Sequence, residues 1–305
     1  MILTLLFCAT PAWRLHVDRG QSYILYTSLF FLFAWLGRKP RKLGGQVLEG
    51  FTGSLLMGLR PIFFGQFALP WDRRRWTTLV AGIAGAALLA ILPVLAFGPS
   101  IWSQYHKGME EHARLYLEQA EQSNEATAFP GKVEGIPFDQ LSRFADIPFG
   151  DTSLYKLVSF DLPSKPLLVL WALLMFGSGF WLLHRCPGQP TLLAWAVAAW
   201  ANIGDFLLPA FRNIYNDVLF LPLLLLGLAV LKEGKPRTWW LMSCLVFVLS
   251  HLTLRFVPKG FIPIPSVIGL IMAIGAIGWT FYVARQATPD EKGKSSDPPG
   301  NLTKA

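Results

Sequence analysis

Apolar runs about as long as a bilayer is thick recur along most of the chain, and they restrict its fold more than any other feature. A helix needs about 20 mostly apolar residues to cross roughly 30 Å of hydrocarbon. Seven segments are predicted as membrane spans on this basis: 21–36, 76–97, 166–184, 190–209, 214–231, 238–256 and 264–284. Hydrophobic residues make up 53% of the chain and charged residues 15%, a balance more apolar than that of a soluble domain. The sequence therefore predicts an all-α polytopic membrane protein.

An eighth apolar region, 43–70, contains Arg60-Pro61 in its middle. Proline removes a backbone donor and disfavours helix at the residue before it, so this region is predicted as two short helices. Basic clusters flank it on both sides, at 38–42 and 73–75. Because Lys and Arg collect in cytoplasmic loops, both flanks are expected on the same side, and the region is predicted to be a membrane hairpin that enters and returns.

With this hairpin, the later basic clusters also fall on the cytoplasmic side. Residues 1–284 are then the membrane domain, and the long segment 98–165 lies on the outer face. The polar tail 285–305 contains Pro, Gly and Ser and is predicted to be disordered in the cytoplasm. The short apolar start, "ILTLLFCAT", has no basic residues before it and is interpreted as a shortened helix rather than a signal peptide.

Composition also argues against several classes of function. The formal charge of +8 is distributed in short clusters beside apolar runs, which indicates membrane orientation rather than nucleic-acid binding. Three scattered cysteines predict neither disulfides nor a metal knuckle. His106 and His112, with Glu110 between them, point to different sides of a helix, so no metal site and no cofactor are expected.

Four stretches together resemble glycosyltransferase family 87. They are "GQSYILYTSLFFLFAW" before a basic loop, "GFTGSLLMGLRPIFF" before "RRRW", "GDTSLYKL" in the outer segment, and "LPAFRNIYNDVLFLPLLLL". The resemblance covers about residues 14–231. It implies a bacterial membrane enzyme with a GT-C-like helical bundle, located in the inner membrane. It further implies transfer of a hexose, mannose in the typical members, from a polyprenyl-phosphate donor to a lipid or glycan acceptor of the envelope.

The chain departs from the family pattern at several positions. Arg60 replaces the usual Lys, Asp151 replaces the usual Asn, and "AFRNIY" keeps the Pro and Tyr of its motif without the Ser-Trp. Enzymes of this fold carry their catalytic carboxylate in a first outer loop, and this sequence begins after the place where that loop is expected. Three interpretations stay open: a truncated or miscalled start, a missing half on a separate chain, or an inactive remnant.

Two cations are predicted at membrane depth or at the outer rim, Arg60 and Arg212. A lipid-phosphate donor brings its phosphate to that level, where a cation stabilises the departing group. Both are therefore candidates for binding the donor phosphate, with snorkelling or capping as the structural alternative. The residues expected to line the same cavity are Gln21, Asp151, Ser153, Asp205, Asn213, Tyr215 and Asn216.

Sugar transfer also needs a general base for the acceptor hydroxyl. The candidate carboxylates on the outer side or at the rim are Asp18, Asp151, Asp205 and Asp217. Asp18 is expected mainly to cap the helix that starts near Gly20, and it is a weak candidate for the base. Asp205 is isolated within a span, so it either pairs with Arg212 or faces a polar lumen.

Two other classes of function fit part of the same pattern. A transporter or flippase subunit also carries rare intramembrane charges and a Pro-broken hairpin. A non-catalytic membrane scaffold accounts for the missing first loop. The absence of an internal repeat and the single large outer segment argue against the transporter, and the scaffold stays an alternative.

Overall fold

The protein forms a bundle of helices in the computed structural model, which describes the larger part of the chain. The described residues are 2–10, 12–13, 23–37, 42–67, 75–108, 111, 164–186, 189–207, 214–256 and 263–286. All regular secondary structure within them is helical. The predictions for Asp18, Gln21, Asp151, Ser153, Arg212 and Asn213 concern residues outside the described ranges, as do those for most of segment 98–165 and for 287–305 of the tail. Arg285 and Gln286, assigned to the tail, belong to the last turn of the final helix.

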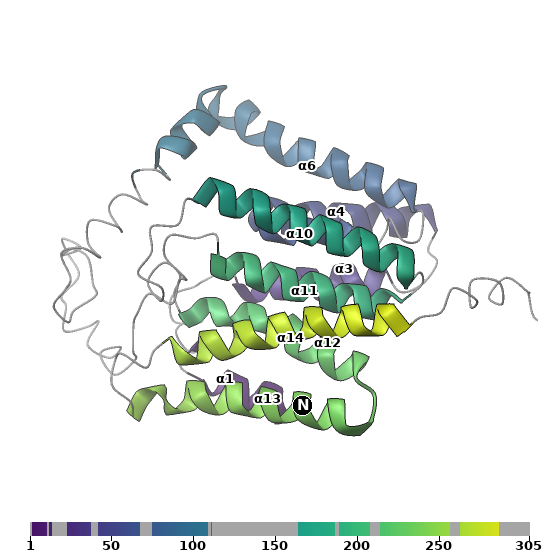
Figure 1. Ribbon diagram of the computed structural model, residues 1–305. Coiled ribbons are helices and arrows are strands. Elements are labelled where there is room, and N and C mark those ends of the chain that lie inside the picture. Colours follow the sequence, from purple (N-terminus) through teal and green to yellow (C-terminus); the bar gives the residue numbers. More distant parts are fainter. Residues whose placement is uncertain are drawn as a thin grey trace, which may run out of the picture.

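The helices lie side by side with their axes roughly aligned, from α6 on one flank to α13 on the other (Figure 1). In chain order they are α1 (Ile2–Cys8), α3 (Tyr23–Leu36), α4 (Leu43–Leu59), η1 (Pro61–Phe67), α6 (Trp76–Phe97), α10 (Ser164–Arg185), α11 (Pro190–Leu207), η3 (Ile214–Leu219), α12 (Phe220–Val230), α13 (Gly234–Thr253), η4 (Leu254–Phe256) and α14 (Ile264–Gln286). Helix α11 is buried on nearly every side and forms the centre of the bundle.

Each segment predicted as a span coincides with a helix, or with η3 and α12 together. Three helical segments within the described residues are long and apolar enough to cross a membrane: Trp76–Phe97, Pro166–Arg185 and Ile264–Gln286. The count of seven spans stays a prediction. Helix α13 begins four residues earlier than expected, because Gly234 adopts φ 80° and turns the chain directly after α12.

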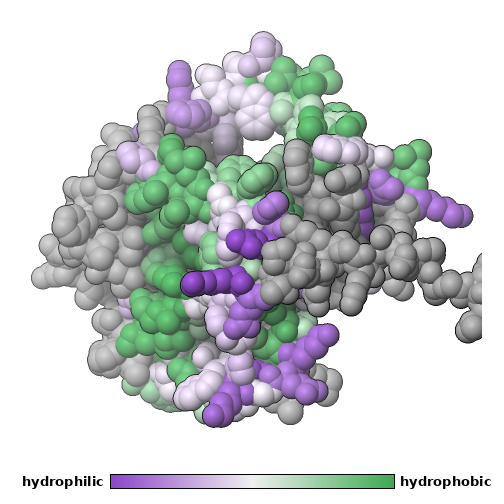
Figure 2. All heavy atoms as spheres, turned by 45° about the vertical axis from the view of Figure 1, so that its right-hand side comes forward, coloured by the Kyte–Doolittle hydropathy of each residue, from purple (hydrophilic) through white to green (hydrophobic). Residues whose placement is uncertain are grey.

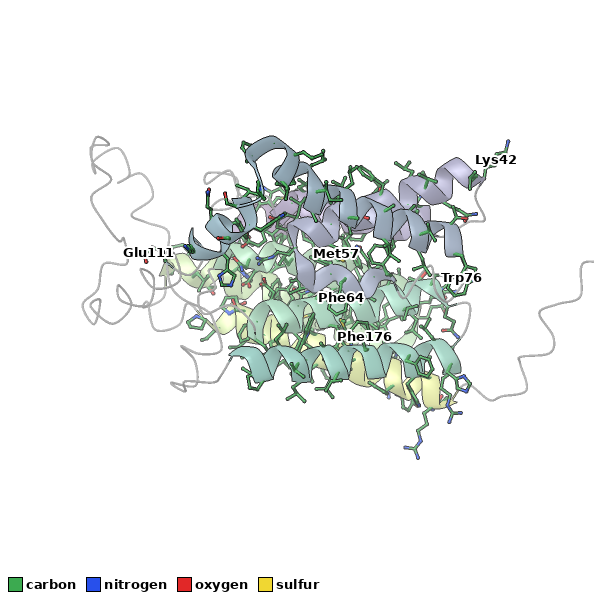
Figure 3. All side chains as sticks on the ribbon, turned by 90° about the horizontal axis from the view of Figure 1, so that it is seen from above. Lys42, Met57, Phe64, Trp76, Glu111 and Phe176 are labelled. Atoms are coloured by element: carbon green, nitrogen blue, oxygen red, sulfur yellow. The ribbon has the colours of Figure 1, made fainter. Side chains whose placement is uncertain are left out.

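The broken region is divided where the sequence places the break. Helix α4 ends at Leu59, Arg60 is extended with φ −146° and ψ 92°, and Pro61 opens the 3-10 helix η1. Lys42 and Trp76, on either side of α4 and η1, lie at the same end of the bundle (Figure 3). There, Nη2 of Arg75 donates a hydrogen bond to the carbonyl oxygen of Gly37, at the end of α3, at 2.7 Å. The chain therefore returns to the end of the bundle from which α4 starts, and the position of this hairpin in a membrane stays a prediction.

Small residues let α4 and α6 approach closely. Ser54 donates a hydrogen bond to the carbonyl oxygen of Gly82 on α6 at 2.5 Å. A Cβ atom added to Gly50 would lie 2.4 Å from the carbonyl oxygen of Thr78, a separation that real Cβ atoms do not show. Glycine at position 50 is thus required by the contact between the two backbones.

Exposed basic residues gather at one end of the bundle. The start of α6, the ends of α10 and α14 and the turn between α12 and α13 lie at this end (Figure 1). Exposed Arg185, Lys235, Arg237 and Arg285 belong to these helix ends, Lys42 lies at the same end (Figure 3), and we refer to it as the basic end. Figure 2 turns this end partly forward and shows hydrophilic residues gathered on it, beside a flank covered by hydrophobic side chains.

Candidate functional site

The candidate site lies at the opposite end of the bundle, where α6 finishes and α10 begins (Figure 1). Four elements that are far apart in the sequence meet there: the start of α3, the break between α4 and η1, the last turn of α11, and η3. Each contributes one polar side chain, and these are Tyr23, Arg60, Asp205 and Asn216. Of the site residues expected from sequence, the structure thus brings together Arg60, Asp205 and Asn216.

Arg60 and Asp205 form an ion pair across 145 positions of sequence. Nη2 of Arg60 contacts Oδ1 of Asp205, whose side chain is 1% exposed, while 26% of the Arg60 side chain remains exposed. The sequence left two possibilities for Asp205, pairing with Arg212 or facing a polar lumen. Its cationic partner among the described residues is Arg60, because the hairpin break packs against the last turn of α11.

Two further contacts hold this ion pair in place. The Asn216 amide lies 3.3 Å from Oδ2 and 3.5 Å from Oδ1 of Asp205, so it donates to the same carboxylate. The guanidinium of Arg60 lies 5.0 Å from the centre of the Tyr23 ring and 3.4 Å from its hydroxyl. Stacking on an aromatic face suits the planar guanidinium and costs it no hydrogen bond.

The ion pair leaves part of the guanidinium able to bind a ligand. Arg carries five N–H donors in a fixed fork, and the Asp205 and Tyr23 contacts both involve Nη2. Nε of Arg60 is buried and has no hydrogen-bond partner within the described part of the chain, while 26% of the side chain as a whole is exposed. A partly exposed guanidinium that is oriented by one carboxylate can bind an additional anion of planar or tetrahedral shape.

Tyr215 lies in η3, and its side chain is outside what the structure describes. Asp217, expected on the outer side or at the rim, is 0% exposed. It is therefore not accessible as a general base, and its level in the membrane stays a prediction. Successive side chains of a 3-10 helix lie about 120° apart, so Asp217 points in a different direction from Asn216 and into the bundle.

Asp217 belongs to a second buried polar cluster, which sequence reasoning missed. Its Oδ2 atom lies 2.8 Å from Nε2 of His251 on α13, and Oγ of Ser266 on α14 donates to Asp217 at 2.8 and 3.0 Å. All three side chains are 0% exposed. An available signal was His251 itself, since an ionisable residue in an apolar segment is rare and usually paired.

A third buried pair lies near the basic end and was also not anticipated. Nη1 of Arg75 contacts Oε2 of Glu49 at 2.8 Å, and the hydroxyl of Thr78 lies 3.4 Å from the same oxygen. Arg75 had been interpreted only as part of a cytoplasmic basic cluster. Its two Nη groups instead join α3, α4 and the start of α6, so this pair holds the base of the hairpin.

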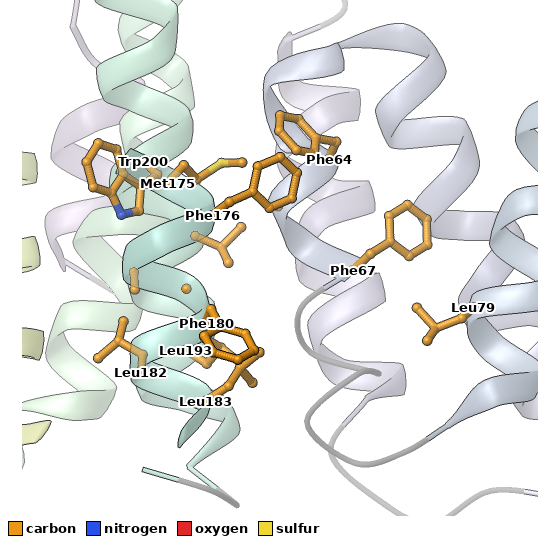
Figure 4. Close-up of a pocket in the computed structure, with 14 residues that line it drawn as sticks. Phe64, Phe67, Leu79, Met175, Phe176, Phe180, Leu182, Leu183, Leu193 and Trp200 are labelled. Atoms are coloured by element: carbon orange, nitrogen blue, oxygen red, sulfur yellow. The ribbon is translucent and has the colours of Figure 1, made fainter. Parts of the chain in front are cut away.

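An apolar cavity of about 280 Å³ lies between η1, α6, α10 and α11. Aromatic rings form much of its wall. Phe64 from η1 lies beside Phe176 from α10, with ring centroids 4.8 Å apart, whereas the ring of Phe67 points toward Leu79 of α6 (Figure 4). The wall segment η1 starts directly after Arg60. A cavity with this lining can accept a hydrocarbon chain, whereas a sugar would leave its hydroxyl groups without partners.

No curated protein and no solved structure matches the chain. The family model described as glycosyltransferase family 87 matches residues 1–209, which is more than half of the chain and includes the hairpin, Arg60 and Asp205. The chain therefore belongs to glycosyltransferase family 87, whose members are membrane glycosyltransferases.

Proposed function

We propose that this membrane glycosyltransferase transfers a hexose, with mannose as the first candidate, from a polyprenyl-phosphate donor to an acceptor of the cell envelope. The reaction takes place on the outer face of a bacterial inner membrane, on the side of the bundle opposite to the basic end. Asp151, Ser153, Gln21, Asn213 and Tyr215 stay candidates for lining the cavity. Arg212 stays a second candidate for the donor phosphate.

The observation that supports this proposal most directly is the environment of Arg60. A cation at this depth requires an anion, and Asp205 supplies one permanently. The Arg60 side chain is still 26% exposed, so a phosphate can approach it without displacing Asp205. The carboxylate therefore acts as an orienting group that holds the guanidinium in its binding geometry before the donor arrives.

The apolar cavity supports a lipid-linked donor over a nucleotide sugar. Its wall includes Phe64 of η1, four residues after Arg60, and consists mainly of Phe, Leu and Met side chains. A phosphate at Arg60 and a hydrocarbon chain along η1 satisfy both the charged and the apolar surface. A nucleotide would place a polar base and ribose against the phenylalanines and lose their hydration.

A transfer assay tests the proposal. Membranes that contain the full-length gene product receive either a labelled polyprenyl-phosphate hexose or a labelled nucleotide sugar, and incorporation into envelope lipid and glycan is measured. Incorporation from the lipid-linked donor alone is expected. Incorporation from the nucleotide sugar alone contradicts the donor assignment. Movement of the intact donor across proteoliposomes without transfer identifies the transporter function instead.

The role of Arg60 is tested on purified, folded variants by measuring donor affinity. Lysine keeps the charge but lacks the fork, so Arg60→Lys is expected to retain partial binding, whereas Arg60→Gln loses most of it. Donor affinity that is unchanged in folded Arg60→Gln would contradict the assignment of the phosphate to this residue.

A further inference from the structure

The short helix η3 carries two neighbouring side chains that enter two different polar clusters. The Asn216 amide donates to Asp205 in the ion pair with Arg60, at 3.3 Å from Oδ2. Asp217 enters the buried cluster with His251 and Ser266. The position of η3 therefore links the proposed donor site to α13 and α14, which contribute no described side chain to that site.

The hydrogen bonds of His251 determine how many protons this cluster holds. Nδ1 of His251 lies 2.9 Å from the carbonyl oxygen of Phe247, which can only accept, so Nδ1 carries a proton. The contact of 2.8 Å between Nε2 and Oδ2 of Asp217 then holds one more proton. Whichever atom carries it, the His251–Asp217 pair has no net charge. Its burial therefore avoids the cost of an isolated charge.

This neutral pair gives η3 an anchor in addition to its own backbone. η3 continues directly into α12, which fixes its last residue, but the hydrogen-bond geometry within a 3-10 helix is poor. Asp217 receives hydrogen bonds from two separate helices, from His251 on α13 and Ser266 on α14. These contacts restrict both the position and the rotation of η3.

We propose that Asp217, His251 and Ser266 are positioning residues for donor binding: they hold η3 so that Asn216 keeps Asp205 and Arg60 in their binding geometry. The inference rests on the proposed function. Donor binding is expected to be sensitive to the position of η3, because the Asn216–Asp205 hydrogen bond of 3.3 Å is lost after a small further displacement. A displacement of about 1 Å in a positioning group can cost about a hundredfold in function.

Two substitutions of His251 separate hydrogen bonding from ring packing. The imidazole packs against Phe247 and Phe7 with ring centroids 4.5 and 6.0 Å apart. His251→Phe keeps an aromatic ring but removes both hydrogen bonds, whereas His251→Gln keeps a donor toward Asp217. A positioning role predicts about a tenfold or greater loss of donor affinity in His251→Phe, with a smaller loss in His251→Gln. A packing role predicts the opposite order.

Trp240→Phe serves as the matched control on the same helix. Trp240 is buried, and its indole nitrogen donates to the carbonyl oxygen of Leu224 on α12 at 3.1 Å. This substitution also removes a buried hydrogen bond between α13 and a neighbour, but it leaves the Asp217 cluster intact. Its melting temperature is expected to fall by an amount similar to that of His251→Gln, with donor affinity unchanged.

A double-mutant cycle with Asn216→Ala tests the pathway. Positioning through Asn216 predicts that His251→Phe causes little further loss of donor affinity once Asn216 has been replaced. The probe is a short-chain isoprenyl phosphate mannose, with protein folding checked by size-exclusion chromatography and thermal unfolding. Losses that multiply independently overturn the proposal, as does an unchanged donor affinity in folded His251→Phe.

The same cycle measured by melting temperature needs no donor, so it separates two kinds of failure. If the wild-type protein binds no donor, the proposed function is wrong. Non-additive shifts in melting temperature would then still support the coupling through η3. Additive shifts overturn the coupling, whatever the substrate.

Discussion

Removing the charges of the Arg60–Asp205 pair one at a time should have unequal effects on stability. Arg60→Gln leaves a carboxylate that is 1% exposed without its guanidinium, whereas Asp205→Asn leaves a cation whose side chain is 26% exposed and can reach water. Removing one partner of a buried ion pair costs about 3–5 kcal/mol. We expect about 3 kcal/mol for Arg60→Gln, since Asn216 still donates to Asp205, and about 1–2 kcal/mol for Asp205→Asn.

The double variant Arg60→Gln/Asp205→Asn carries two amides that can hydrogen-bond to each other, with no buried charge. It is expected to be about 1–2 kcal/mol more stable than Arg60→Gln alone. The assay is reversible unfolding of the purified protein in mixed micelles, monitored by tryptophan fluorescence. A double variant that is destabilised by the full sum of the two single effects would refute the reasoning, because the two side chains would then not interact.

Three other predictions concern the scaffold, each measured by thermal unfolding. Gly50→Leu should destabilise the protein by at least about 1–3 kcal/mol, since its Cβ would lie 2.4 Å from a carbonyl oxygen of α6. The control Gly44→Leu should be neutral, because nothing lies within 4 Å of a Cβ at that position. Equal effects of the two substitutions would contradict the close contact. Arg75→Lys should lower the free energy of unfolding by about 1–3 kcal/mol, because an ammonium cannot bridge Glu49 and the end of α3 as the two Nη groups of Arg75 do. An unchanged melting temperature would argue against that bridge. Trp195→Phe should cost about 1–2 kcal/mol by removing the hydrogen bond of 3.0 Å to an α12 carbonyl, so wild-type stability would contradict it.

Sequence pattern was sufficient for the features that depend on local chemistry. The helix positions follow from the length of each apolar run, because transfer of apolar side chains out of water is a property of each segment. The break at Arg60-Pro61 follows from the missing donor and the ring of Pro61. The order of four short motifs was enough to indicate the family that the match to residues 1–209 shows.

Sequence pattern was not sufficient for the partners of the buried charges. Nothing near Asp205 in the sequence indicates Arg60, and Asp217 could be placed at a rim as readily as beside His251. The seven-span count and the outer location of 98–165 also stay predictions.

Neighbouring residues are therefore enough to predict which segments are helical and apolar, where the hairpin breaks, and which family the chain resembles. Which buried charges meet depends instead on the packing of distant segments. A buried ionic contact depends on the rotation and depth of two helices within about 1 Å, and these are set by side-chain packing over the whole bundle. Asn216 and Asp217 illustrate the difference: they are adjacent in sequence, yet the packing of η3 directs one to the Arg60 site and the other to His251.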